Sequence, residues 1–256
     1  MAETNLCAVI SNRALTKTHF ELCLDAPAIA NAAVPGQFVH VACGHSHLLR
    51  RPISICETKD GFLRLVFEVR GEGTEWLSRR KAGDVLDILG PLGKGTFPLF
   101  ENDPRPVLLV GGGVGVPPLL SVARARPAHV VLGYRNEAAM ILYRDFLASS
   151  DTVMIATDDG SVGTHGTVAE PVRRLLEQND YAGVLACGPK PMLRAVCDLA
   201  KEKDVPCYVS MEERMGCGVG ACLVCVCKTK HEDGEHNSRV CMDGPVFPAE
   251  KVVWEK

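Results

Sequence analysis

Four cysteines near the end of the chain have a spacing that suits an iron-sulfur cluster. Cys217, Cys222 and Cys225 form the pattern C-x4-C-x2-C, and Cys241 follows at a distance. This pattern is the plant-type arrangement of [2Fe-2S] ligands. Three sulfurs on one side of a compact cluster require a tight loop, and the glycines between these cysteines allow the necessary backbone angles. The sequence therefore predicts a [2Fe-2S] cluster held by these four thiolates.

A structural zinc site is the main alternative for the same cysteines. Zinc ligands usually come as paired C-x2-C units, whereas the first gap here is four residues, so the spacing favours iron. Cys227 is the odd thiol, and alternation along a strand would put it on the same side as Cys225, either beside the cluster or as filler. His231 and His236 lie among acidic residues, which indicates the solvated loop of a hairpin rather than a mixed Cys/His site.

A glycine-rich segment offers a second site. An apolar run at 106–110 leads into Gly111, Gly113 and Gly115, and prolines suited to a first helical turn follow directly. A helix start presents free N–H groups and a positive dipole end to a diphosphate, and glycine lets such a ligand approach closely. The segment departs from the strict G-x-G-x-x-G pattern, so it fits either a nucleotide site or a plain tight turn.

A third candidate site lies on an expected strand that begins at Arg51. Arginine supplies a planar fork of donors for a phosphate, and the hydroxyl of Ser54 can bond the edge of a ring. Gly73 and Thr74 follow the end of another expected strand. Taken alone this signal is weak, because an arginine beside a proline is more often an exposed edge residue.

The elements that must position these residues change character along the chain. Between about residues 5 and 100, short apolar stretches are broken by Gly and Pro, which predicts an antiparallel barrel. The individual strands expected there are 38–43, 51–56, 62–69 and 85–89.

After Asp103, apolar runs alternate with helical segments, which predicts a parallel, doubly wound sheet. The expected strands are 106–110, 129–132, 153–156, 183–186 and 207–209, and the expected helices are 117–126, 137–149, 168–177 and 191–203. The remainder is rich in Cys and Gly and too short for an apolar core of its own. We therefore predict three domains: a barrel at 1–102, a nucleotide-binding domain at 103–210 and a cluster domain at 211–256.

Composition excludes several classes of protein. The chain has 256 residues, 46% hydrophobic and 23% charged, which is ordinary for a globular protein. Its formal net charge of -3 argues against a nucleic-acid binder. No apolar run approaches the roughly 20 residues that span a bilayer. The start, at residues 1–5, lacks the pattern of a secretory signal, so we expect a cytoplasmic protein that is not bound to a membrane.

The order of these motifs resembles the ferredoxin-NADP reductase superfamily and, within it, the electron-transfer subunits of class 1B dihydroorotate dehydrogenase. The resemblance extends over nearly the whole chain. Its most specific feature is the C-terminal placement of the cluster cysteines after the segment 211–216. The resemblance implies three cofactors, which are FAD, a [2Fe-2S] cluster and NAD. It also implies that Cys187 lies beside the nicotinamide; the alternative is that Cys187 only ends a buried strand.

The resemblance assigns the FAD contacts residue by residue. Two expected strand segments and the residues that follow the second carry them: Arg51, Pro52, Ile53 and Ser54; Val66, Phe67 and Glu68; Gly73 and Thr74. Glu68 departs from the basic residue expected at its position. The glycine turn would bind the nucleotide. Arg135 could reach the 2'-phosphate of NADP, but Glu137 nearby disfavours the added negative charge, so we expect NAD. Asp158 and Asp159 fit either a ligand contact or a turn cap.

The resemblance also implies a relay in pyrimidine biosynthesis. An FMN-containing catalytic subunit would oxidise dihydroorotate, and electrons would pass through the cluster and FAD to NAD. The expected assembly is a heterotetramer with two copies of each subunit. Two alternatives remain open at the level of sequence. One is a related reductase subunit that serves a hydrogenase, sulfite reductase or ferredoxin, and the other is a non-catalytic, zinc-binding interaction module.

Overall fold

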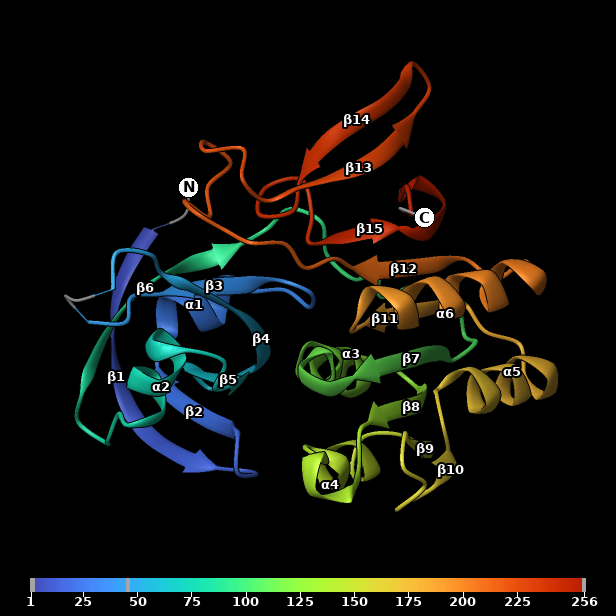
Figure 1. The fold of residues 1–256 in the computed structure, drawn as a ribbon, viewed down its shortest axis with the longest axis horizontal. Helices are drawn as coiled ribbons and strands as arrows, with labels where there is room; N and C mark the ends of the chain where they lie inside the picture. The colour runs from blue at the N-terminus through green and yellow to red at the C-terminus, as the bar shows by residue number, and fades with distance from the viewer. Residues whose placement is uncertain (1–2, 45–46, 255–256) are drawn as a thin grey trace. The chain divides into compact units, whose positions relative to one another are not determined.

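The computed structural model describes residues 3–44 and 47–254, so the first two residues of the predicted start lie outside it. The chain divides into two compact units (Figure 1). The first contains residues 1–96, 212–227 and 238–245, and the second contains 97–211, 228–237 and 246–256. Within the described residues, no helix is long and apolar enough to cross a membrane.

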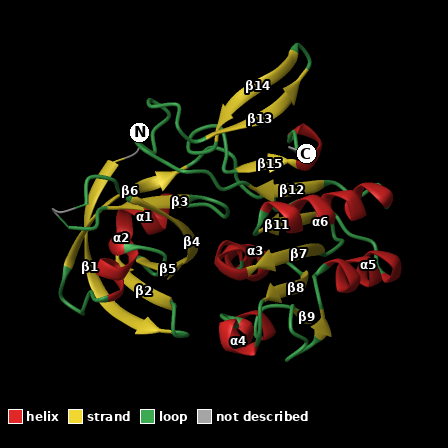
Figure 2. Cartoon of the chain, viewed as in Figure 1, coloured by secondary structure: helices red, strands yellow, loops and turns green. Residues whose placement is uncertain are grey.

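The first unit contains a closed barrel, as the sequence predicts (Figure 2). Its strands pair in the order β1-β2-β5-β4-β3-β6, and neighbouring strands are antiparallel. The bounds are Glu3–Ala14 for β1, His19–Asp25 for β2, Phe38–Val41 for β3, Arg51–Lys59 for β4, Phe62–Glu68 for β5 and Val85–Leu92 for β6. Two short helices accompany them, α1 at Pro27–Ala32 and α2 at Glu72–Ser78.

The barrel core follows from the period-2 alternation of its strands. Val39 and Val41 of β3 and Ile53 and Ile55 of β4 belong to one buried apolar cluster. Their immediate neighbours along each strand must therefore point away from that core. This alternation gives β3 and β4 a second face, which becomes important for the site.

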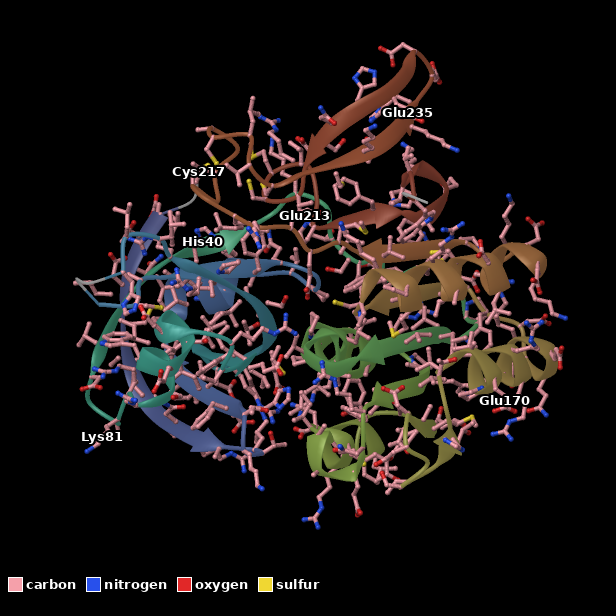
Figure 3. All side chains as sticks on the ribbon, viewed as in Figure 1. His40, Lys81, Glu170, Glu213, Cys217 and Glu235 are labelled. Atoms are coloured by element: carbon pink, nitrogen blue, oxygen red, sulfur yellow. The ribbon has the colours of Figure 1, made fainter. Side chains whose placement is uncertain are left out.

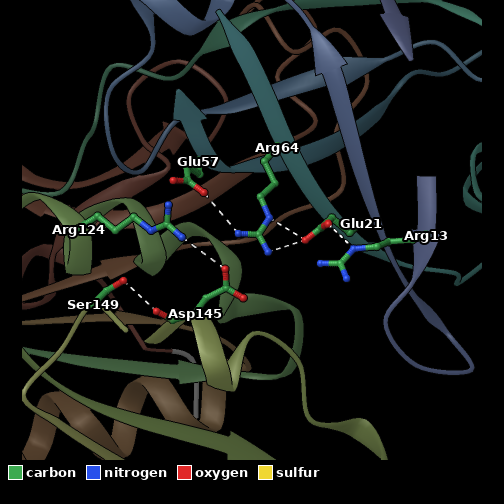
Figure 4. A network of polar contacts seen from close by, with 7 residues as sticks. All are labelled: Arg13, Glu21, Glu57, Arg64, Arg124, Asp145 and Ser149. Carbon is green, nitrogen blue, oxygen red and sulfur yellow. Dashed lines mark hydrogen bonds and ion pairs between the residues drawn. The ribbon is translucent and has the colours of Figure 1, made fainter. Parts of the chain in front are cut away.

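An ion-pair network centred on the buried Glu21 also stabilises the barrel wall (Figure 4). Arg64 Nε donates to Glu21 at 2.7 Å, and Arg64 Nη1 lies 3.3 Å from Glu57. Arg13 donates to the other oxygen of Glu21 at 2.6 Å. The network ties β1, β2, β4 and β5 together through charged groups rather than through apolar packing.

The second unit contains a seven-stranded sheet of order β10-β9-β8-β7-β11-β12-β15. The first six strands run parallel and β15 runs antiparallel to β12, which confirms the predicted nucleotide-binding fold. The bounds are Val107–Gly112 for β7, Ala128–Tyr134 for β8, Thr152–Thr157 for β9, Thr164–His165 for β10, Gly183–Cys187 for β11, Cys207–Ser210 for β12 and Val246–Pro248 for β15. Because the chain moves outward from β7 to β10 and then returns to β11, the order reverses between β7 and β11. Such switch points are where open α/β sheets bind ligands.

One expected helix begins with a 3-10 turn, and another is broken into two short pieces. Residues 117–126 form a 3-10 turn, η2 at Pro117–Leu119, followed by a short helix, α3 at Leu120–Ala125. Residues 137–149 break into η3, Glu137–Ala139, and α4, Tyr143–Leu147. The second break has a tertiary cause, because the buried Tyr134 hydroxyl donates to the Ile141 carbonyl at 2.6 Å. The later helices, α5 at Ala169–Gln178 and α6 at Lys190–Glu202, lie close to their predicted positions.

The C-terminal segment divides between the two units. The residues that carry the cluster cysteines belong to the barrel unit, whereas 246–256 belong to the sheet unit and supply β15. Between them, β13 (Val226–His231) and β14 (Gly234–Arg239) pair as a hairpin. The expected loop at 231–238 is therefore only a two-residue turn between strand ends. Our prediction of three domains with boundaries at 102 and 210 stays a prediction.

Candidate functional site

The four predicted cluster cysteines lie in the barrel unit as two hydrogen-bonded pairs. The Cys217 N–H donates to Cys222 Sγ at 3.4 Å, and the Cys241 N–H donates to Cys225 Sγ at 3.4 Å. Cys225 and Cys241 are buried, whereas Cys222 is exposed. The sequence pairs the cysteines by spacing alone, and the structure adds which thiols are neighbours.

This two-by-two arrangement suits two iron atoms better than one metal ion. A structural zinc ion takes four ligands at one centre. In a [2Fe-2S] cluster with four cysteine ligands, each iron takes two thiolates, so two hydrogen-bonded pairs fit that group.

Backbone N–H groups converge on the first of these sulfurs. Cys217 Sγ accepts from the N–H of Val219 at 3.4 Å and from the N–H of Ala221 at 3.3 Å. Burial would raise the pKa of the Cys217 thiol, but these hydrogen bonds and that of Cys222 outweigh it and lower the pKa to about 6. Gly218 and Gly220 make this geometry possible with φ of 74° and 81°. The loop is therefore shaped to hold a thiolate, the form that binds metal.

The buried pair has the opposite electrostatics. Burial and the neighbouring Cys225 both raise the pKa of the Cys241 thiol. Two adjacent buried thiols resist ionising together unless a cation compensates their charge. A metal centre supplies that compensation, since coordinated thiols are deprotonated.

The predicted FAD residues Arg51 and Gly73 lie in direct contact. A Cβ on Gly73 would lie 2.6 Å from Arg51 Nε, so the guanidinium lies over the start of α2. The preceding Arg50 is different, because it makes two bonds to the Asp87 carboxylate at 2.7 and 2.9 Å. No carboxylate pairs with Arg51 in the part of the chain that the structure describes. Arg51 is thus the arginine that is left to bind an anion such as a diphosphate.

The other predicted FAD residues differ in where their side chains lie. Ile53 and Phe67 belong to the barrel core, so their side chains point inward. The Thr74 hydroxyl accepts from the Gly71 N–H and donates to the Gly71 carbonyl, which caps α2. Glu68 pairs with Arg70 at 2.6 Å. Pro52, Ser54 and Val66 are strand neighbours of the core residues and lie on the opposite face by alternation.

The glycine turn lies at the switch point of the sheet. Gly111 pairs in register with Cys187, so the turn and the predicted nicotinamide segment meet at the ends of β7 and β11. A Cβ on Gly115 would lie 2.3 Å from the Cys187 carbonyl oxygen, so Gly115 serves backbone packing. Around Gly113 (φ 53°), a Cβ would meet nothing within 4 Å. Gly113 is therefore the glycine that borders open space.

The aspartates after β9 act as part of a turn. The Asp159 carboxylate accepts from the Ser161 N–H at 2.9 Å and from the Ser161 hydroxyl at 2.6 Å. These two bonds lower the pKa of Asp159. Of the two functions open to this segment, the geometry favours the turn cap for Asp159.

Sequence reasoning missed one residue of the barrel unit, His40 of β3. It is completely buried, and neither ring nitrogen has a hydrogen-bond partner among the described residues. A lone histidine in an apolar strand gives no signal of this in the sequence.

Two segments of the chain match domain families of known proteins. Residues 109–198 match the family described as "Oxidoreductase NAD-binding domain", and residues 212–253 match "Iron-sulfur cluster binding domain of dihydroorotate dehydrogenase B". The electron transfer subunit of dihydroorotate dehydrogenase B (NAD(+)) from Desulforamulus reducens is 45% identical over 241 residues, which are 90% of this chain and 91% of the relative. The same subunit from Geobacillus kaustophilus is 44% identical over 257 residues, 96% of each chain.

The chain belongs to the electron transfer subunits of NAD-dependent dihydroorotate dehydrogenase B. It is thus an oxidoreductase subunit of pyrimidine biosynthesis with an iron-sulfur cluster binding domain and an NAD-binding domain. As a subunit, it implies a catalytic partner. Among solved structures, an NADH-dependent reduced ferredoxin-NADP oxidoreductase is similar with a TM-score of 0.86 and 30% identity, over 99% of this chain and 92% of that one. The match to an iron-sulfur domain disfavours the zinc-binding alternative.

Proposed function

We propose that this subunit receives electrons from an FMN-containing, dihydroorotate-oxidising catalytic subunit and delivers them to NAD through a [2Fe-2S] cluster and an FAD. The observation that carries the proposal is the pairing of Cys217 with Cys222 and of Cys225 with Cys241 in one unit. A flavin is required between the other two groups because the cluster handles single electrons whereas NAD accepts a hydride.

The cluster loop supplies both thiolate ligands and backbone N–H donors in this proposal. All four are the ligands, and the N–H groups of Val219 and Ala221 stabilise the charge on Cys217 Sγ. Hydrogen bonds to the sulfurs are among the factors that set a cluster's reduction potential. The loop thus both assembles the cluster and tunes it.

FAD binding is assigned to the barrel. Arg51 binds the diphosphate, and Gly73 gives its guanidinium room to lie over α2. The segments 51–54 and 66–68 lie on neighbouring strands, because Ile55 of β4 pairs with Leu65 of β5. The family relationship supports the flavin. Among the described residues Arg51 has no carboxylate partner and donates only to the Leu49 carbonyl, which supports this location for the diphosphate.

NAD binding is assigned to the switch point between β7 and β11. Gly111, Gly113 and Gly115 form the turn, with Gly113 open to a ligand, and Cys187 lies at the end of β11 for contact with the nicotinamide. The names of the curated relatives specify NAD(+), which supports NAD rather than NADP.

The catalytic subunit is expected to dock over the exposed cluster loop, in a heterotetramer with two copies of each subunit. Apolar side chains on this loop are unusually accessible: Val219 is 44%, Leu223 63% and Val224 55% exposed. Leu223 and Val224 directly follow the exposed Cys222 in the sequence, and Val219 precedes it by three residues. Exposed apolar groups at one place are typical of an interaction surface.

The test is co-expression with the catalytic subunit, anaerobic purification, a visible spectrum and metal analysis. We expect one FAD and two irons per copy of this chain, and two copies of each subunit in the complex. A colourless protein without iron would contradict the cluster assignment. A protein with flavin but no iron would contradict the cluster assignment and agree with FAD binding in the barrel.

A further inference from the structure

His40 is a buried polar residue that the contacts described so far leave unexplained. Its exposed fraction is 0%, and neither Nδ1 nor Nε2 has a hydrogen-bond partner among the described residues. Burying a polar group without a hydrogen bond costs free energy, so such groups normally have a partner. A partner that is bound rather than encoded would explain the histidine.

The position of His40 in the barrel points to the cofactors. It pairs in register with Pro52 of the proposed flavin strand, just as Phe38 pairs with Ser54. Val39 and Val41 point into the barrel core, so His40 and Phe38 face outward with Pro52 and Ser54. The rings of Phe38 and His40 lie edge to face at 6.0 Å, which agrees with their placement on one face.

The cluster loop covers His40 on this outer face. A Cβ on Gly218 would lie 2.7 Å from His40 Nδ1 and 2.9 Å from His40 Cε1. Gly218 directly follows the cluster cysteine Cys217, which Figure 3 labels together with His40. The imidazole therefore lies between the strand that carries the flavin motif and the loop that carries the first cluster ligand.

The ring is neutral at physiological pH. Burial, with Arg50 and Arg51 adding to it, lowers the pKa of His40 to about 4. A neutral imidazole carries one N–H donor and one acceptor nitrogen. Sulfide and thiolate sulfurs of a cluster are acceptors, so the donor of His40 has chemistry that fits the proposed cluster.

We propose that His40 is a positioning residue for the cluster, whose ring N–H donates a hydrogen bond to a cluster or ligand sulfur above the outer face of β3. The inference rests on the proposed function, because it requires the cluster to be held by Cys217 and its partners. A hydrogen bond to sulfur stabilises the reduced cluster, which carries more negative charge, and so raises the reduction potential. The same ring fixes the loop at Gly218 against the barrel.

The experiment compares His40→Leu, His40→Asn and His40→Gln with Phe38→Leu in the co-purified complex. Leucine removes both nitrogens, whereas the amides keep a donor near Nδ1 or Nε2. Phe38→Leu is the matched control, because it disturbs the same face and leaves the His40 nitrogens in place. The measurements are iron and FAD content, the EPR spectrum of the reduced cluster and its reduction potential.

We expect His40→Leu to retain iron and FAD, to shift the cluster to a lower potential and to change its EPR spectrum. One of the amide variants should restore part of the lost reduction potential. The cluster of Phe38→Leu should have a reduction potential near that of the wild type. Pulsed EPR on the wild-type complex with 15N-labelled histidine should also show a histidine nitrogen coupled to the cluster. That measurement decides the matter if His40→Leu does not retain iron.

A wild-type cluster potential and spectrum in His40→Leu would overturn the inference, as would the absence of nitrogen coupling in the wild type. A shift of the flavin potential alone would also overturn it and assign the ring to the FAD. Failure of the proposed function is distinguishable, because the wild-type complex itself would then contain no iron.

Discussion

Arg51 and Gly73 are matched to each other: a Cβ at residue 73 would lie 2.6 to 2.8 Å from three atoms of the Arg51 side chain. The conflict would be with the far end of a flexible side chain, so Gly73→Ala should move the guanidinium rather than unfold the barrel. We expect FAD affinity to fall about ten- to a hundredfold, because a charge-assisted hydrogen bond contributes roughly 1.5 to 3 kcal/mol. Titration of the FAD-free protein with FAD measures this.

Gly71→Ala is the control for that substitution, because a Cβ at residue 71 meets nothing within 4 Å. It should leave FAD affinity unchanged. Arg51→Ala should lose as much FAD affinity as Gly73→Ala while its iron content stays near the wild type. Unchanged FAD binding in Arg51→Ala would remove that arginine from the site.

Substitution of a cluster cysteine should remove iron, whereas substitution of the neighbouring Cys227 should not. Cys222→Ser removes one of four thiolates, so iron content should collapse, and transfer from the catalytic subunit to NAD should be lost with it. NADH-dependent reduction of a small artificial acceptor should persist, because the barrel and the sheet each have their own core. Cys227→Ser is the control and should keep its iron. Coupling of dihydroorotate to NAD at the wild-type rate in iron-free Cys222→Ser would contradict the relay.

The glycine turn should respond very differently at two of its positions. Gly115→Ala places a Cβ 2.3 Å from the Cys187 carbonyl oxygen, and backbone cannot move aside cheaply. Overpacking of this kind costs about 1 to 3 kcal/mol or more. Gly113→Ala meets nothing, so it should cost only the left-handed strain of about 1 to 2 kcal/mol while crowding the NAD site. Thermal unfolding and NADH titration together separate the two effects, and equal stability losses would contradict this distinction.

The sequence predicts the features that depend on local pattern and misses those that depend on tertiary contacts. The alternation of apolar residues and the turn residues predicted β3 to β6 and the parallel sheet. The spacing of the cysteines predicted an iron-sulfur cluster rather than a zinc site. Pattern could not show that Tyr134 breaks the helix expected at 137–149, because that hydrogen bond forms only in the fold. Nor could the pattern show that Arg50 is paired with a carboxylate whereas Arg51 is not, because Asp87, the partner of Arg50, lies far away in the sequence on β6.

Partner docking should depend on the apolar side chains of the cluster loop. Leu223 is 63% exposed beside Cys222, so Leu223→Asp should lower the affinity for the catalytic subunit, by about tenfold or more if the residue is central to the interface. The cluster should still assemble, because the thiolates are unchanged. Leu147→Asp on α4 is the control, since Leu147 is also exposed, at 50%, but lies in the other unit. Sedimentation of the mixed subunits measures the affinity, and an equal loss in both variants would argue against this surface.

The acid stability of the barrel should depend on Glu21. Burial would raise the pKa of this carboxyl, but hydrogen bonds and charge from Arg13 and Arg64 outweigh it, so the folded pKa is lowered. A lowered carboxyl pKa contributes stability above the unfolded value near 4.3, and this contribution is lost as the pH falls through the folded pKa.

Glu21→Gln should therefore be less stable than the wild type at pH 7, by about 1.5 to 3 kcal/mol, since it removes a charge-assisted network (Figure 4). The difference should shrink as the pH falls below 4, where the wild-type carboxylate also becomes protonated. Glu75→Gln is the control, because Glu75 pairs with Arg79 on the exposed face of α2 and such pairs contribute little. Urea unfolding of both variants between pH 3 and pH 7 measures the effect. A constant difference across that range would mean that Glu21 acts through its packing rather than its charge.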